Sequence, residues 1–292
     1  MEKVKAIFIL MRPYQWHKNV LVYAAVFFSA KFSHVDSVLQ ASVGFILFCI
    51  LSSSVYVLND LVDRKNDQQH PLKRQRPIAA GVVSVRLAVV VYVFLTSGGL
   101  FAGYLFSHQF FIIALSYCIF NIFYTFFLKN IVILDVFAVA ISYIFRVLAG
   151  AVVIHVAITS WFLIASTLLA LLLALGKRRH ELLFLGEASS AHRVCLPQYT
   201  VAFLDQLITI VTTTIIVVYS LYTMDEHTKI VLGTQFMPLT IPFVIFGIFR
   251  YLYIINVKEK GGNPSRDLLL DKSIVITVIL WVAEIVILVV KK

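Results

Sequence analysis

The chain has 292 residues, of which 60% are hydrophobic and 14% charged, and its mean hydropathy is +0.91. This composition excludes a soluble domain and predicts a membrane protein that crosses the bilayer several times. The formal net charge of +10 is explained by basic residues at the membrane surface, so it does not indicate nucleic acid as a partner.

The predicted elements are helices throughout. Residues 1–12 place apolar and basic side chains on opposite faces and predict a short amphipathic helix at the inner membrane surface. Nine apolar runs follow, and a helix needs about 20 such residues to cross a bilayer. They lie near 20–32, 38–58, 86–106, 109–128, 132–154, 160–176, 200–223, 236–256 and 273–290. The sequence therefore predicts an all-α polytopic membrane protein in which residues 1–292 form a single domain of nine transmembrane helices.

Basic residues between the runs predict the orientation of the chain. With a cytoplasmic N-terminus, 19 of the 25 Lys and Arg residues fall in cytoplasmic segments, as expected for loops that stay inside. The polar motifs also gather after the second, fourth, sixth and eighth runs, which end on that side. We therefore expect a functional site at the cytoplasmic mouth of a helical bundle in the inner (plasma) membrane.

The densest polar stretch, residues 59–78, follows the second run and reads NDLVDRKNDQQHPLKRQRPI. Asp60, Asp63 and Asp67 are spaced so that one helical face would present three carboxylates, with Asn59 beside them. Like charges repel, but a hard divalent cation takes oxygen ligands and is commonly shared with phosphates. The spacing predicts a Mg²⁺ ion carrying a diphosphate on these four residues. The alternative is a solvated loop whose acids balance its bases.

Basic and polar side chains near the same mouth are suited to phosphate oxygens. The candidate substrate-binding residues of this kind are Lys18, Asn19, Asn59, Lys73, Arg74, Arg76, Tyr124, Lys129, Lys177 and Arg178. For Lys177 and Arg178, which belong to the motif GKRRHEL after the sixth run, a simple positive anchor at the membrane surface is the alternative.

Three further charged residues lie at or within the apolar runs. Asp135 and Arg146 are 11 residues apart and therefore share one face of the fifth run. A buried arginine should face a polar cavity, or a partner such as Glu284, rather than lipid. Arg250, near the end of the eighth run, is either a side chain that reaches the membrane surface or a substrate contact.

Several motifs together resemble the UbiA superfamily of intramembrane prenyltransferases, and within it the decaprenyl-phosphate phosphoribosyltransferase branch. They are RPYQWHKN, NDLVDRKND with HPLKRQRPIAAG, LKNIVILD with FRVLAG, GKRRHEL and FGIFRYLY. The resemblance extends over nearly the full length. It implies a UbiA-like bundle that, with Mg²⁺, transfers 5-phosphoribose from 5-phosphoribosyl 1-diphosphate to a polyprenyl (decaprenyl) phosphate. The product would be a lipid-linked pentose donor for cell-envelope polysaccharide.

The resemblance also implies roles for the acidic residues. Asp60, Asp63 and Asp67 would hold Mg²⁺ on the leaving diphosphate, and Asp135 would bind ribose hydroxyls or stabilise the cationic carbon. Most members of the superfamily carry a second Asp-rich box where this chain has GKRRHEL, and the basic residues would meet the additional phosphates of donor and acceptor. Two alternatives are an aromatic or quinone-type prenyltransferase of the same fold and a lipid transporter or flippase. Whether the chain forms a homo-oligomer is left open.

Overall fold

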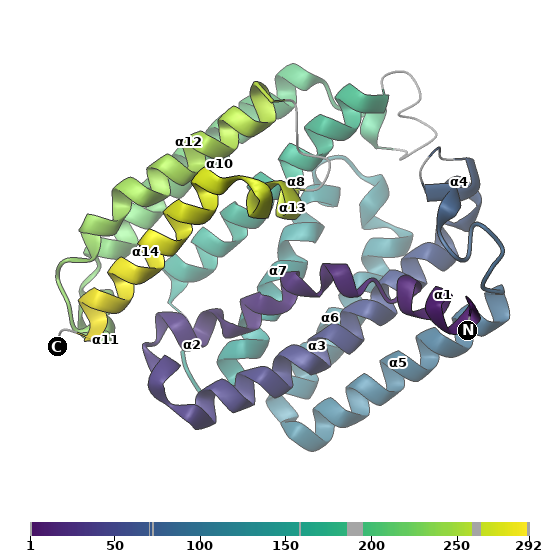
Figure 1. Cartoon of the computed structure of the whole chain (residues 1–292), viewed down its shortest axis with the longest axis horizontal. Coiled ribbons are helices and arrows are strands. Elements are labelled where there is room, and N and C mark those ends of the chain that lie inside the picture. Colours follow the sequence, from purple (N-terminus) through teal and green to yellow (C-terminus); the bar gives the residue numbers. More distant parts are fainter. Residues whose placement is uncertain are drawn as a thin grey trace. The chain divides into compact units, whose positions relative to one another are not determined.

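A computed structural model of the protein describes residues 2–69, 71, 73–157, 159–185, 195–258 and 264–290. Every regular element in these ranges is a helix (Figure 1), which confirms the predicted all-α class. The elements up to residue 153 are α1 (Glu2–Leu10), η1 (Pro13–Tyr23), α2 (Ala24–Phe28), η2 (Lys31–Ser33), α3 (Val35–Val62), α4 (Arg64–Gln69), η3 (Lys73–Gln75), α5 (Val85–Phe106), α6 (His108–Phe126), η4 (Leu128–Asn130) and α7 (Leu134–Val153). Those that follow are α8 (Ser160–Leu185), η6 (Leu196–Gln198), α10 (Val201–Met224), α11 (Glu226–Leu232), η7 (Met237–Thr240), α12 (Ile241–Asn256), α13 (Pro264–Leu270) and α14 (Lys272–Val290).

Within the part of the chain that the structure describes, eight helices are long and apolar enough to cross a membrane. They coincide with eight of the nine predicted runs and comprise Val35–Val62, Val85–Phe106, His108–Asn130, Leu134–Val153, Ser160–Phe184, Val201–Met224, Met237–Asn256 and Lys272–Val290. The first predicted run, residues 20–32, is instead divided between the 3-10 helix η1 and the short helices α2 and η2. The protein is thus a multi-pass membrane protein whose first apolar segment is built from short pieces.

The chain divides into two compact units. Unit 1 comprises Met1–Phe27, Lys31–Ala157 and Ser190–Cys195, and unit 2 comprises Phe28–Ala30, Ile158–Ser189 and Leu196–Lys292. That the two units belong to a single catalytic domain remains a prediction.

In unit 1, α3 is the central helix and packs against α5, α6, α7 and η1. Residues Glu2–Leu10 form the helix α1, and its buried residues Ala6 and Leu10 join a core cluster with Val57 of α3. On α1, Val4 and Phe8 remain exposed, which suits a helix that lies against lipid. The position of α1 on the inner surface remains a prediction.

Unit 2 is built on α8 and α10, which pack along each other, and on α12 and α14. Arg179 of α8 ties three of these helices together. Its Nε donates to Asp205 Oδ1 of α10 at 2.6 Å, and its Nη1 donates to the carbonyl of Ile255 on α12 at 2.9 Å. This arginine of the GKRRHEL motif therefore holds the unit together.

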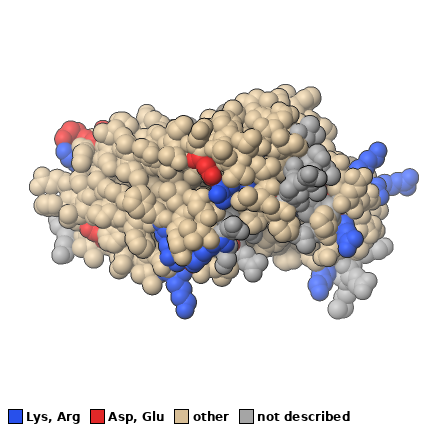
Figure 2. Space-filling view, turned by 90° about the horizontal axis from the view of Figure 1, so that it is seen from above, with Lys and Arg blue, Asp and Glu red and all other residues tan. Residues whose placement is uncertain are grey.

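The molecular surface reflects the membrane environment. Figure 2 shows a broad area of uncharged side chains, with the charged ones gathered in small groups. Large apolar side chains such as Phe94 of α5 and Ile279 of α14 are exposed. Such a surface is expected for helices that contact lipid.

Replacing Gly150 by Ala should destabilise unit 1. A Cβ atom on Gly150 of α7 would lie 1.9 Å from the carbonyl oxygen of Val22 in η1, so the backbone of one element must move. Overpacking of this kind costs about 1–3 kcal/mol. Thermal unfolding in detergent should show a lower midpoint for Gly150→Ala. Gly98→Ala is the matched control, because a Cβ there meets nothing within 4 Å; equal midpoints for the two variants would contradict the expectation.

Candidate active site

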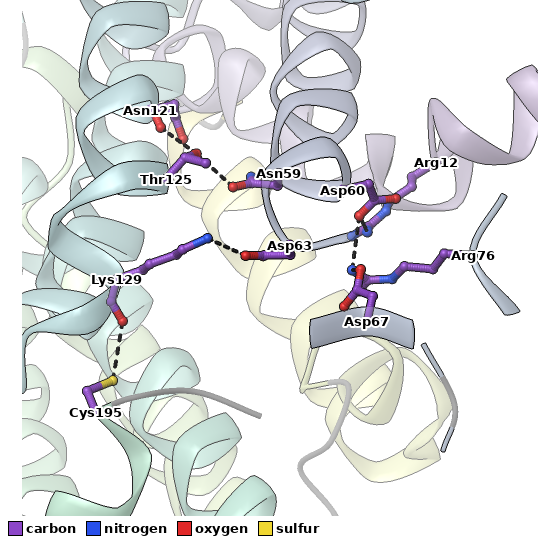
Figure 3. A network of polar contacts seen from close by, with 10 residues as sticks. All are labelled: Arg12, Asn59, Asp60, Asp63, Asp67, Arg76, Asn121, Thr125, Lys129 and Cys195. Carbon is purple, nitrogen blue, oxygen red and sulfur yellow. Dashed lines mark hydrogen bonds and ion pairs between the residues drawn. The ribbon is translucent and has the colours of Figure 1, made fainter. Parts of the chain in front are cut away.

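The acidic stretch lies where α3 ends and α4 begins (Figure 3). Asp63 is the residue that follows α3, with φ −83° and ψ 3°. Its backbone N–H donates to the carbonyl of Asn59 at 2.9 Å, and the N–H of Asp67 donates to the carbonyl of Asp63 at 2.8 Å. The helical hydrogen-bond spacing thus continues across the break. Asp60 and Asp67 consequently lie on the same side.

Asp60 and Asp67 share one basic partner. The Nη1 atom of Arg76 lies 2.9 Å from Oδ1 of Asp60 and 2.7 Å from Oδ2 of Asp67. The side chains of Asp60 and Asp67 are only 2% and 5% exposed. Because a buried carboxylate is costly unless a cation pairs with it, Arg76 is needed to hold the two acids together.

Arg12 is a second partner of Asp60 and is a residue that the sequence reasoning did not include in the site. Its Nη2 donates to Oδ1 of Asp60, and its guanidinium lies over the ring of Tyr56 at 5.1 Å from the centroid. The backbone of Arg12 is left-handed, with φ 52°, which is uncommon for a residue with a side chain. The only sequence signal was its place in the motif RPYQWHKN.

Asp63 faces away from this pair, so the predicted single face of three carboxylates is wrong. Its Oδ1 accepts a hydrogen bond from Nζ of Lys129 in η4 at 2.5 Å. Beside it, the Oδ1 atom of Asn59 accepts from Oγ1 of Thr125 on α6 at 2.7 Å. The reason is that α3 ends at Val62, and the turn after it directs Asp63 toward η4 (Figure 3).

The buried Arg146 of α7 lies among polar groups, as predicted, and is 4% exposed. Its Nε donates to Oδ1 of Asn19 at 2.7 Å, its Nη1 to the carbonyl of Ser142, and its Nη2 to the hydroxyl of Tyr117 at 3.4 Å. The rings of Tyr117 and Tyr143 each lie 5.4 Å from the guanidinium. These contacts keep the guanidinium away from lipid, where a charged group has an unfavourable free energy. Glu284, the partner considered from the sequence, belongs to unit 2.

A series of hydrogen bonds connects the surroundings of Arg146 with the acidic box, which comprises Asn59, Asp60, Asp63 and Asp67. The Oγ of Ser142 donates to Oδ1 of Asn121 at 3.4 Å, and Oγ1 of Thr125 lies 2.7 Å from two acceptors of its single hydrogen, the carbonyl of Asn121 and Oδ1 of Asn59. Asn19 extends the polar groups toward α3, since its Nδ2 donates to Oγ of Ser52 at 3.0 Å. Thr125 and Asn121 were missed, because a lone Thr or Asn in an apolar run carries no distinctive pattern.

The other predicted residues of unit 1 are placed as follows. Asp135 is fully buried near the start of α7, on the same helix as Arg146. Lys73 and Arg74 lie in η3, immediately before Arg76, and Arg74 is exposed. Lys18 in η1 and Tyr124 on α6 are half-buried.

The remaining predicted residues, Lys177, Arg178 and Arg250, belong to unit 2. Arg178 is buried and its Nη1 donates to Oε2 of Glu181 at 2.6 Å, while Nζ of Lys177 lies 3.9 Å from Oε1 of the same glutamate. Arg250 binds Asp271 through both Nε and Nη2, each at 3.0 Å. Arg178 and Arg250 are thus held by acidic side chains of their own unit. That this unit faces the acidic box remains a prediction.

Part of this box has the chemistry of a metal site. Among the described residues, no three His, Cys, Asp or Glu side chains come close enough together to hold one. The carboxylates of Asp60 and Asp67 nevertheless lie within 3 Å of a single atom, Nη1 of Arg76, so a cation in its place would meet both. Carboxylate oxygens are the ligands that Mg²⁺ prefers. These two residues therefore have the chemistry to hold a divalent cation, whereas Asp63 is paired with Lys129.

Fold and site together define a polytopic all-α membrane protein in which buried carboxylates are paired with basic side chains at the end of α3. The sequence model of the UbiA prenyltransferase family matches residues 20–178, and the chain belongs to this family.

Relatives and solved structures agree with this membership. The chain is 31% identical over 286 residues to decaprenyl-phosphate phosphoribosyltransferase of Mycobacterium tuberculosis, which covers 97% of this chain and 92% of the relative. It is 30% identical over 282 residues to the protein of that name from Corynebacterium glutamicum, covering 93% of this chain and 83% of the relative. The structure of a UbiA homolog from Archaeoglobus fulgidus bound to GPP and Mg²⁺ matches with a TM-score of 0.74 and 19% identity, over 97% of this chain and 99% of that one. At that identity the match shows the fold alone.

Replacing Asn19 by Ala should destabilise unit 1, because it removes the acceptor of the buried Arg146 Nε. A lost hydrogen bond to a charged group costs about 1.5–3 kcal/mol. The thermal midpoint of the purified variant should fall accordingly. Asn256→Ala, which truncates an exposed asparagine at the end of α12, should leave it unchanged; a similar effect of both variants would show that Asn19 is not a specific support.

The pair of Arg250 and Asp271 should make stability depend on pH. Hydrogen bonds from Arg250 lower the pKa of Asp271 to about 2, below the value of about 3.9 expected in an unfolded chain. The stabilisation is therefore complete above about pH 4 and is lost as the pH falls toward 2.

Thermal unfolding at several pH values measures this effect. Asp271→Asn should lower the midpoint at pH 7, and the difference from the wild type should shrink between about pH 4 and pH 2. Asp36→Asn, at an exposed position of α3, is the control. A difference that persists unchanged at pH 2 would show that the carboxylate charge is not its cause.

Proposed function

We propose that this protein transfers 5-phosphoribose from 5-phosphoribosyl 1-diphosphate to a polyprenyl phosphate and releases diphosphate. The observation that carries the proposal is the identity of 30–31% with proteins named decaprenyl-phosphate phosphoribosyltransferase, which extends over 93–97% of this chain. A decaprenyl acceptor and a role in cell-envelope polysaccharide synthesis are proposed on the same basis.

The acidic box would bind the diphosphate of the donor through Mg²⁺. Asp60 and Asp67 provide two carboxylates directed at one point, and Asp63 and Asn59 lie beside them. The bound Mg²⁺ would neutralise charge on the leaving diphosphate. Arg76, together with Lys73 and Arg74 next to it in the chain, would donate hydrogen bonds to oxygens of the leaving diphosphate.

The transfer exchanges one C–O bond for another. The bond between ribose C1 and the diphosphate oxygen breaks, and its electron pair leaves with the diphosphate. An oxygen of the acceptor phosphate forms the new bond to C1. Because that phosphate is already ionised at neutral pH, no side chain needs to remove a proton. Asp135 is assigned to the ribose hydroxyls or to the positive charge that develops on the sugar.

The 5-phosphate of the donor and the phosphate of the acceptor lipid need cations outside the acidic box. Lys129 and Lys177, whose side chains are 14% and 43% exposed, are assigned to the 5-phosphate or the acceptor phosphate, together with Arg178. Lys18, Asn19, Tyr124, Arg146 and Arg250 remain candidate substrate contacts. The proposal places the whole chain, as one catalytic domain, in the inner (plasma) membrane with the box on the cytoplasmic side.

A radiolabel assay on membranes that contain the protein tests the proposal. Labelled phosphoribose should enter the lipid fraction when polyprenyl phosphate and Mg²⁺ are present. Asp63→Asn should lower this transfer about 100-fold or more, since it removes a charged group from the site of leaving-group stabilisation. Asp36→Asn, an exposed carboxylate on α3, should keep wild-type activity.

The same assay separates the alternatives. Transfer seen only from a prenyl diphosphate to an aromatic acceptor would establish the prenyltransferase alternative and refute phosphoribosyl transfer. Translocation of a lipid without any covalent product would favour the transporter alternative. Full activity of Asp63→Asn would refute the assigned role of the box.

A further inference from the structure

We propose that Arg76 occupies the place of the metal ion in the acidic box, so that the metal binds by displacing this guanidinium, which then binds the diphosphate. The proposal rests on the proposed function in one respect, namely that the box binds a metal with a diphosphate. It concerns the order and coupling of binding at that site.

The contacts of Arg76 define the place. A single atom, Nη1, lies 2.9 Å from Asp60 Oδ1 and 2.7 Å from Asp67 Oδ2. A cation that bridges these same two oxygens has to lie between them, where Nη1 lies, and both acids are almost completely buried. Arg76 and a metal bound to this pair of oxygens are therefore mutually exclusive.

The charges in the box are balanced by side chains alone. Asp60 pairs with Arg12 and Arg76, Asp67 with Arg76, and Asp63 with Lys129. Among these ion pairs of the described residues, three carboxylates thus meet three cations. A divalent ion that arrives alone meets no excess of negative charge, and it must also break two charge-assisted hydrogen bonds.

Arg76 differs from Arg12 in what else holds it. The guanidinium of Arg12 lies over the ring of Tyr56 and contacts Asp60, so Arg12 can remain with Asp60 after a metal enters. Arg76 follows η3, and it forms ion pairs with the two carboxylates that the metal requires. Of the two arginines, Arg76 is the one that the metal exchanges.

A diphosphate changes this balance. It supplies oxygens that accept hydrogen bonds from the displaced guanidinium, and its negative charge compensates the added metal. Metal and diphosphate should therefore each raise the affinity of the box for the other, and by the same factor. A box of this kind binds its metal chiefly together with the donor.

Binding of Mn²⁺, used in place of Mg²⁺, tests the inference on the full-length protein in detergent. Free Mn²⁺ is measured by electron paramagnetic resonance with and without inorganic diphosphate. Arg76→Gln should bind Mn²⁺ alone about tenfold more tightly than the wild type, since no charge-assisted hydrogen bonds have to be broken. The matched control is Arg86→Gln, which removes an exposed positive charge at the start of α5 and should bind as the wild type does.

Two further measurements locate the effect. The double variant Arg76→Gln with Asp67→Asn should lose the gain in Mn²⁺ affinity. Inorganic diphosphate should raise the Mn²⁺ affinity of the wild type by a larger factor than that of Arg76→Gln. Equal or weaker Mn²⁺ binding by Arg76→Gln, or the same gain in Arg86→Gln, would overturn the inference.

The wild type alone provides a test that needs no variant to fold. Phenylglyoxal modifies arginine side chains, and mass spectrometry quantifies the reaction at Arg76. Mn²⁺ should increase this reaction by releasing the guanidinium, and inorganic diphosphate added with Mn²⁺ should suppress it. A reaction unaffected by saturating Mn²⁺ would overturn the inference. Because these measurements use no phosphoribosyl donor, they can succeed or fail independently of the proposed transfer.

Discussion

Three carboxylates at the end of a membrane helix are stable only while cations neutralise them, and unit 1 is organised around this electrostatic constraint. The three cations come from the segment before η1, from the segment after η3 and from η4. Segments distant in the sequence are thereby fixed to the end of α3. Removing one partner of a buried ion pair leaves an uncompensated charge, so the contacts that support the fold also hold the carboxylates that are proposed to bind the metal. Structural and functional demands on Arg12, Arg76 and Lys129 therefore coincide.

A similar constraint governs the interior of unit 1. Water is scarce within a bilayer, so the guanidinium of Arg146 must find its acceptors in the protein. Asn19, Ser142 and Tyr117 provide them, and Thr125 and Asn121 continue the polar groups to Asn59. The segment that carries Asn19 is a 3-10 helix rather than part of a long transmembrane helix. Its irregular backbone packs against α7 and α3, and Asn19 and Val22 are its buried residues.

The long helices were predictable because length and hydropathy alone determine a membrane span. The first run escaped this logic. The segment just before it carries Trp16 and Asn19, which contact Ser53 and Ser52 of α3, and Asn19 also contacts Arg146 of α7; no hydropathy pattern reveals these contacts. In the box, residue types predicted the acids and Arg76 but not their pairing. Helical periodicity placed Asp63 with Asp60 and Asp67, whereas the helix end at Val62 turns Asp63 toward Lys129. Arg12 was missed as a partner because long-range ion pairs leave no local signal.

The basic motif GKRRHEL carries less free charge than its sequence suggests. Glu181 binds Arg178 and lies near Lys177, and Asp205 binds Arg179, so two acids offset three bases. Partial neutralisation has a physical advantage, because bare like charges side by side repel and weaken a helix. Lys177 is the most exposed of the three bases, and Arg179 serves the packing of α8, α10 and α12.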